Sequence, residues 1–198
     1  MAELVLASAS PTRRAILHQA GLHFRVIASD TDESLFDATT PVLVEALARQ
    51  KSRAVAARLD HGLVLGCDSL LDVDGVAYGK PASKGDAIAR WKLQRGRSGT
   101  LFTGHVLIDA SDGREVTEVV ATVVHFGVPS DEEIARYVDS QEPLDKAGAF
   151  TLEGRSSAFL RGIDGDAGNV RGLSIPALSR LLGALGWSVM DFWRETAH

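Results

Sequence analysis

The sequence has a single cysteine, Cys67, and no apolar stretch that approaches the length of a membrane span. One thiol cannot build an intramolecular disulfide framework, and it fits a reducing compartment. A helix that crosses a bilayer needs roughly 18 consecutive apolar residues. The N-terminus also lacks the basic segment and apolar run that a secretory signal carries. We therefore expect a cytoplasmic protein that does not bind a membrane.

An excess of positive charge is also absent, because 21 lysines and arginines stand against 26 aspartates and glutamates, a formal net charge of −5. A general nucleic-acid binder usually has a basic excess, so we expect no nucleic-acid partner. A small phosphorylated ligand held by a few local cations stays compatible with this charge. Repeats and long linkers are missing too, and 198 residues suit a single domain over 1–198, with two lobes at most.

Strand and helix signals alternate along the chain, which is typical of an α/β layer architecture. The sequence predicts strands at residues 4–7, 24–28, 63–67, 101–108, 116–126, 159–163 and 187–190. It predicts helices at residues 13–20, 40–59, from 84 to about 95, 134–138 and 176–185. Capping residues and glycines mark most of these ends, as Ser83 and Gly186 do.

The segment from residue 4 to residue 14 is the clearest candidate for a binding site. An apolar strand leads into the turn Ser8-Ala9-Ser10, and Pro11 begins a helix. Proline suits the first helical position because its missing N–H would have no partner there, and Ser10 is a good N-cap. The turn aims backbone N–H groups, two hydroxyls and the side chains of Arg13 and Arg14 at one place, where we expect a phosphate. The alternative is an ordinary helix start with solvated arginines.

Charged residues recur where predicted loops leave strands or helices, the places that most often carry function. Asp68 follows the apolar strand 63–67, so we expect it at the carboxyl edge of the sheet, where open α/β sheets bind ligands. Glu33 lies in an acidic turn, and with Asp68 it would offer Mg²⁺ the oxygen ligands it prefers beside phosphates. Compact positive charges suited to phosphates are Lys51, Lys80 and Lys146. The alternatives are that Asp68 only caps a turn, that Glu33 lies in a solvated acidic turn, and that the lysines lie on the surface without a function.

Taken in order, these segments resemble the Maf family of nucleoside triphosphate pyrophosphatases, also known as septum formation inhibitor proteins. The resemblance covers about residues 4–185. The segments that carry it are Leu6-Ala7-Ser8-Ala9-Ser10-Pro11 with Arg13-Arg14, Asp32-Glu33, Ala48-Arg49-Gln50-Lys51, Gly66-Cys67-Asp68-Ser69, Gly79-Lys80-Pro81, Thr103-Gly104 and Asp145-Lys146-Ala147-Gly148. Each segment alone is unspecific, and their number, order and spacing make the resemblance strong.

The resemblance implies a mixed sheet flanked by helices, of the Maf/inosine-triphosphatase-like type, with two lobes around a central cleft and often a homodimer. It implies a cytoplasmic house-cleaning enzyme that hydrolyses the bond between the α- and β-phosphates of a nucleoside triphosphate. The products would be a nucleoside monophosphate and pyrophosphate, and the cofactor a divalent cation, Mg²⁺ or Mn²⁺. Asp68 matches the proton acceptor, and Glu33 and Asp68 would hold the metal. The matching substrate-binding positions are Ser8, Arg13, Lys51, Lys80 and Lys146.

Three further positions, Thr12, Ser69 and Glu153, bear on the choice of base. Family members that act on dTTP and UTP usually have arginine, threonine and glutamine there, and those that act on 7-methyl-GTP have tryptophan, glutamine and glutamate. Glu153 matches the second group and could pair with the cationic 7-methylguanine ring, whereas the segment at 145–148 is closer to the first group. The base therefore stays open. The alternative function is a nucleotide-binding regulator of cell division with incidental hydrolysis.

Overall fold

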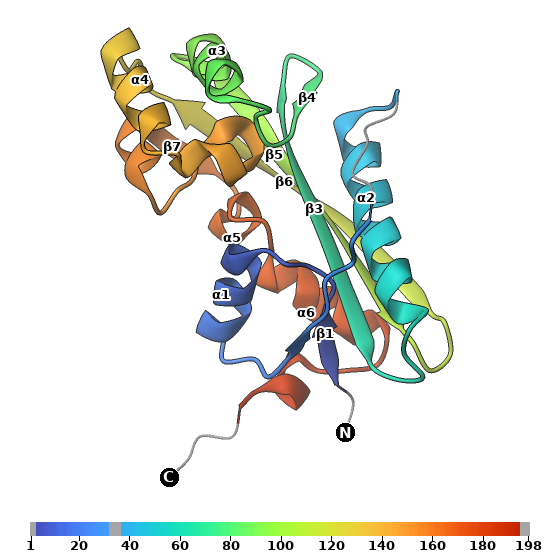
Figure 1. The fold of residues 1–198 in the computed structure, drawn as a ribbon. Coiled ribbons are helices and arrows are strands. Elements are labelled where there is room, and N and C mark those ends of the chain that lie inside the picture. Colours follow the sequence, from blue (N-terminus) through green and yellow to red (C-terminus); the bar gives the residue numbers. More distant parts are fainter. Residues whose placement is uncertain (1–2, 32–36, 195–198) are drawn as a thin grey trace. The chain divides into compact units, whose positions relative to one another are not determined.

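The computed structural model describes residues 3–31 and 37–194, and its elements carry the labels of Figure 1. In chain order they are β1 (Leu4–Leu6), α1 (Pro11–Gln19), β2 (Arg25–Val26), α2 (Thr40–Ala56), β3 (Leu63–Val73), β4 (Val76–Tyr78), α3 (Lys84–Gln94), β5 (Ser98–Asp109), β6 (Glu115–Phe126), α4 (Asp131–Asp139), β7 (Leu160–Asp164), α5 (Ala167–Val170) and α6 (Ile175–Ala184). Short 3₁₀ helices are η1 (Glu142–Asp145), η2 (Ala147–Ala149), η3 (Arg155–Phe159) and η4 (Val189–Phe192).

Seven strands within the described residues form one sheet in the order β2-β1-β3-β5-β6-β7, with β4 paired to β3. β1 runs parallel to β2 and to β3, whereas β4 runs antiparallel to β3 and β7 antiparallel to β6. The expected mixed sheet flanked by helices is therefore confirmed. No helix in the described part of the chain is both long and apolar enough to cross a bilayer.

The chain divides into two compact units, which agrees with the expectation of two lobes. Unit 1 comprises residues 1–68, 103–120 and 172–198, and unit 2 comprises residues 69–102 and 121–171. The long strands β3, β5 and β6 contribute residues to both units.

The core of unit 1 is built on alternate residues of β1. Leu4 and Leu6 pack with apolar residues of α1 and α6, whereas Val5 packs with Val55 of α2. Because successive side chains of a strand point to opposite faces, α2 covers one face of β1 and the pair α1 and α6 covers the other. The backbone of α2 also approaches β3 very closely: a Cβ on Gly66 would lie 2.3 Å from the carbonyl oxygen of Ala48.

The core of unit 2 is centred on Trp91 of α3, which is fully buried. Its indole makes edge-on contacts with Phe126, Tyr137 and Phe159, at centroid distances of 5.7, 5.5 and 5.9 Å. Edge-to-face pairs of this kind are favourable beyond the area they bury. The indole N–H donates to the carbonyl of Ala149 at 2.8 Å, so the core also holds the 3₁₀ helix η2. Figure 1 shows α3 and α4 side by side in this unit.

Two predicted strands differ from the structure, and the first difference moves Asp68. The strand predicted to end at Cys67 continues to Val73, because Leu70 and Leu71 are also buried and β4 folds back to pair with 71–73. Asp68 therefore lies in the middle of β3, so the prediction that it stands at the carboxyl edge of the sheet was wrong.

The second difference lies near the C-terminus. The strand predicted at 187–190 is wrong, because Ser188 begins the 3₁₀ helix η4. Its hydroxyl accepts a hydrogen bond from the Met190 N–H, and its own N–H donates to the carboxylate of Asp191. This reciprocal pair is a capping box, which starts a helix even in an apolar segment.

Candidate functional site

The turn between β1 and α1 has the local structure that its sequence predicts. Ser10 is the N-cap of α1, and its hydroxyl accepts a hydrogen bond from the Arg13 N–H at 3.4 Å. Pro11 occupies the first turn of the helix, where no N–H is required. The Ser10 N–H donates to the Ser8 hydroxyl at 3.2 Å, which keeps the turn tight. The start of α1 is therefore held by the hydroxyls of its own turn.

Arg13 ties this turn to the segment that precedes α6. Its Nη1 donates to the Ser8 hydroxyl at 3.3 Å, and its Nε donates to the carbonyl of Gly172 at 2.8 Å. The Ser8 oxygen thus accepts two hydrogen bonds, so its own O–H is left to act as a donor. Ser8 is 7% exposed, Arg13 is half-buried and Arg14 is exposed. Of the two arginines, Arg13 is the one that the structure brings to the turn.

Lys51 and Asp68 form a buried ion pair in unit 1. The Nζ of Lys51, on α2, donates to Oδ1 of Asp68, on β3, at 2.5 Å. Lys51 is 5% exposed and Asp68 is 7% exposed, so water has little access to either charge. The close approach of α2 to β3 at Gly66 brings the two side chains together. The structure therefore joins two residues that the sequence predicted separately.

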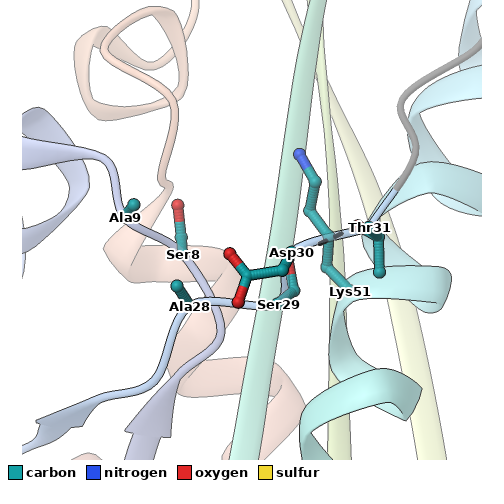
Figure 2. A pocket seen from close by; sticks show the side chains of 7 residues that line it. All are labelled: Ser8, Ala9, Ala28, Ser29, Asp30, Thr31 and Lys51. Atoms are coloured by element: carbon teal, nitrogen blue, oxygen red, sulfur yellow. Dashed lines mark hydrogen bonds between the residues drawn. The ribbon is translucent and has the colours of Figure 1, made fainter.

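A cavity of about 170 Å³ opens beside Lys51. Figure 2 shows its lining, which comes from the β1–α1 turn, the segment after β2, and α2: Ser8, Ala9, Ala28, Ser29, Asp30, Thr31 and Lys51. Pockets that enclose a whole drug-sized ligand usually span about 300–1,000 Å³, so this cavity fits only part of a nucleotide. Its hydroxyls and its lysine suit a phosphate group.

Four of the other predicted site residues belong to unit 2, namely Ser69, Lys80, Lys146 and Glu153, and Thr12 belongs to unit 1. Lys80 is exposed in the loop between β4 and α3. The Nζ of Lys146 is 3.0 Å from the Asp145 carboxylate, in the segment between η1 and η2. Ser69 follows Asp68 in β3, and Thr12 is half-buried in the first turn of α1, in unit 1. Oε1 of Glu153 is 2.8 Å from the guanidinium of Arg171, a partner that the sequence did not predict.

Comparison with known proteins decides the family. The family model described as Maf-like protein matches residues 3–185 of the chain. The chain belongs to the Maf family. A protein of Streptomyces coelicolor named nucleoside triphosphate pyrophosphatase is 56% identical over 193 residues, which cover 96% of this chain and 94% of that protein. Proteins with the same name from Synechocystis sp. and Microcystis aeruginosa are 50% and 46% identical, and each match covers 96% of this chain and 97% or 98% of the relative.

Among solved structures, the Staphylococcus aureus Ham1 protein aligns with a TM-score of 0.46 at 18% sequence identity. That alignment covers 79% of this chain and 90% of the Ham1 chain.

Two buried groups of this Maf protein, Cys67 and His105, are influenced by the charge of Arg13. Burial raises the pKa of the Cys67 thiol to about 11, against the opposing influence of the Arg13 and Lys51 charges. The thiol is therefore protonated at neutral pH, and a protonated thiol is a poor nucleophile. Burial, followed by the nearby Arg13 charge, lowers the pKa of His105 to about 4. Neutral His105 accepts a hydrogen bond from the Ser174 N–H at its Nε2, so its proton is on Nδ1.

The metal that the family implies would need oxygen ligands. Glu33 lies outside the described residues, so its predicted pairing with Asp68 as a metal ligand stays a prediction. Among residues 3–31 and 37–194, no group of three or more His, Cys, Asp and Glu could hold a metal ion. Mg²⁺ commonly takes only one or two carboxylates and completes its shell with substrate phosphates and water. The carboxylate of Asp30 stands between Ser8 and Lys51 in Figure 2, and a cation would offset its repulsion of a phosphate. The donors present therefore fit a metal that enters with the substrate.

Sequence reasoning missed two polar arrangements. The first is at Asp30, which lines the cavity because tertiary structure brings it beside Ser8 and Lys51. The second is at His125, where Ser98 Oγ lies 2.7 Å from Nδ1 and Asp164 Oδ2 lies 2.9 Å from Nε2. These three residues come from β5, β6 and β7, and the side chain of Asp164 is 78% exposed. They form a cross-strand ladder on the surface of the sheet, which no sequence spacing would indicate.

Proposed function

We propose that this protein hydrolyses the anhydride bond between the α- and β-phosphates of a nucleoside triphosphate, releasing a nucleoside monophosphate and pyrophosphate. One observation carries the proposal: the buried Asp68 carboxylate is bonded to Lys51, and Lys51 lines the same cavity as the turn at the start of α1. Membership of the Maf family supports it, as do relatives at 46–56% identity that are named nucleoside triphosphate pyrophosphatase.

The cavity supplies what a polyphosphate needs. A triphosphate carries close to four negative charges, so hydrolysis requires cations and N–H or O–H donors around the phosphate oxygens. The Lys51 ammonium and the Ser8 hydroxyl line the cavity, and Arg13 holds Ser8 in position. In this proposal the phosphates occupy the cavity, and the base and sugar extend beyond it. Lys80 and Lys146 stay predictions from the family resemblance.

Asp68 acts as the general base in this proposal. Lys51 binds one of its oxygens, Oδ1, and so fixes the orientation of the carboxylate. Oδ2 then accepts a proton from the water that attacks the phosphoryl group. A positioned carboxylate of this kind contributes about 10²–10⁴-fold to a rate. A divalent cation bound by Asp30 or Asp68 would polarise the phosphoryl group when present.

The physiological role, the base and the assembly are proposed on the family resemblance alone. The proposed role is that of a house-cleaning enzyme in the cytoplasm. The proposed base preference is either for dTTP and UTP or for 7-methyl-GTP, and the proposed assembly is a homodimer. The ion pair between Glu153 and Arg171 bears on the base, because a cationic 7-methylguanine ring would have to compete with Arg171 for the carboxylate.

Identification of the products tests the proposal. The purified protein would be incubated with dTTP, UTP, CTP, 7-methyl-GTP or GTP, in Mg²⁺ and separately in Mn²⁺, and the products separated by chromatography. We expect a monophosphate and pyrophosphate from one or two of these nucleotides. Release of a diphosphate and inorganic phosphate would contradict cleavage between the α- and β-phosphates. Failure to turn over any of the five would contradict the proposed enzyme.

A further inference from the structure

The Asp86–Arg90 pair of α3 holds the loop that carries Lys80 at both ends. At the first end, Nη1 of Arg90 donates to the carbonyl of Gly79 at 2.6 Å. At the other end, the N–H of Ala82 donates to Oδ2 of Asp86 at 2.8 Å. Pro81 has no N–H and a fixed φ, so little freedom is left in the backbone on either side of Lys80. All of these residues belong to unit 2.

The same carbonyl also joins this loop to the one that carries Lys146. The oxygen of Gly79 accepts a second hydrogen bond, from the Gly148 N–H at 3.0 Å. Gly148 has a φ of +67°, and a Cβ there would lie 2.7 Å from the side chain of Leu71, so only glycine fits. Gln94, one turn after Arg90 on α3, donates to the carbonyl of Gly148 at 3.0 Å. One helix therefore holds the backbone beside both lysines.

The geometry of Arg90 separates this role from that of an ordinary helix ion pair. Exposed ion pairs four residues apart on a helix contribute little to stability. The side chain of Arg90 is 14% exposed, and its guanidinium lies over the ring of Tyr78, 5.4 Å from the centroid. Its Nε and Nη2 bind the two oxygens of Asp86 at 3.0 and 2.7 Å, while Nη1 binds Gly79. With all three nitrogens engaged, Arg90 is suited to position the loop rather than to bind a phosphate itself.

We propose that Asp86 and Arg90 are positioning residues that fix Lys80, and through Gly79 the neighbouring Lys146 segment, for contact with the phosphates of the substrate. This inference rests on the proposed function, because it gives the two lysines a phosphate to bind. The hydrogen bonds from Arg90 hold the pKa of Asp86 below its ordinary value, so the pair stays ionised at neutral pH.

Arg90→Gln tests the proposal by two independent measurements. Hydrogen exchange at the Ala82 and Gly148 amides reports on the loop and needs no substrate. We expect exchange at these amides to quicken about tenfold or more, because their acceptors lose a fixed position. The matched control is Arg95→Gln, which removes another arginine paired with an aspartate, Asp131, near the end of the same helix. Unchanged exchange at both amides in Arg90→Gln would overturn the proposal, whether or not the protein is an enzyme.

Steady-state kinetics of single and double variants test whether Arg90 acts through Lys80. We expect Arg90→Gln to raise KM for the nucleotide about tenfold with a smaller change in kcat, because a lysine that is no longer held in place binds the phosphates less well. In a Lys80→Ala background the same substitution should have little further effect on KM. Arg90→Lys keeps the charge but cannot bind Asp86 and Gly79 together as a planar fork does, so it should restore KM only in part. If the effects of Arg90→Gln and Lys80→Ala on KM simply multiply in the double variant, the proposal is overturned. An inactive wild type would overturn the proposed function, and hydrogen exchange would still test the positioning of the loop.

Discussion

Replacing Lys51 by Met removes the cation from a buried ion pair, so the Asp68 carboxylate stays buried without an ion-pair partner. The two residues are 5% and 7% exposed, and their charged atoms are 2.5 Å apart. Removing one member of such a pair costs about 3–5 kcal/mol, because the charge that stays is kept from water. At an effective dielectric constant of about 20, two charges 4 Å apart attract by about 4 kcal/mol, which is the same size. We expect Lys51→Met to lower the free energy of unfolding by about 3–5 kcal/mol.

Urea unfolding followed by circular dichroism at pH 7 measures this loss in wild type, Lys51→Met, Asp68→Asn and the double variant. The double variant should recover most of the loss, since neither charge is then left alone. Lys84→Met is the matched control: the side chains of Lys84 and its partner Asp139 are 49% and 72% exposed. An exposed pair contributes at most about 1 kcal/mol. A loss for Lys51→Met as small as that of the control would refute the reasoning from burial.

Three further predictions concern the surroundings of the site. Because the pKa of His105 falls from 6.5 to about 4 on folding, the unfolded chain binds a proton in this window that the folded chain does not. The contribution of His105 to the free energy of unfolding should therefore be full above pH 6.5 and fall by about 3 kcal/mol toward pH 4. Unfolding curves of His105→Gln should show a weaker pH dependence, and an unchanged dependence would contradict the lowered pKa of His105. Gly66→Ala should cost about 1–3 kcal/mol in urea unfolding, because the methyl group would meet the Ala48 carbonyl; a neutral result would contradict the close approach of α2 to β3. Glu153→Gln should lower the rate on 7-methyl-GTP relative to UTP, and an unchanged ratio would remove Glu153 from base selection.

Short-range signals predicted the β1–α1 turn well. Ser10 and Pro11 act on the backbone within one helical turn, so an N-cap and a first-turn proline are readable from the sequence and appear in the structure. Glycine and capping residues likewise placed most helices within a few residues. The alternation of strands and helices was enough to predict an α/β protein, and the family resemblance added the expectation of a mixed sheet.

Features set by tertiary contacts were not readable in this way. The extension of β3 past Asp68 depends on pairing with β4, and the helix η4 depends on a capping box that competes with an apolar strand pattern. The Lys51–Asp68 pair joins residues on a helix and a strand, and only their packing shows that they meet. The Arg90 contacts with Gly79 could not be expected either, because a residue four positions from an aspartate on a helix is usually paired at the surface.

The most direct test of the central claim compares pyrophosphate release by Asp68→Asn with release by wild type, on the nucleotide that wild type turns over best. Asp60→Asn, a change of an exposed aspartate in the same unit, is the matched control. Asparagine keeps an oxygen for Lys51 but cannot accept a proton from water, so we predict a loss of kcat of about 100-fold or more with the folded state retained. A folded Asp68→Asn protein that releases pyrophosphate as fast as Asp60→Asn would contradict the assignment of Asp68 as the base.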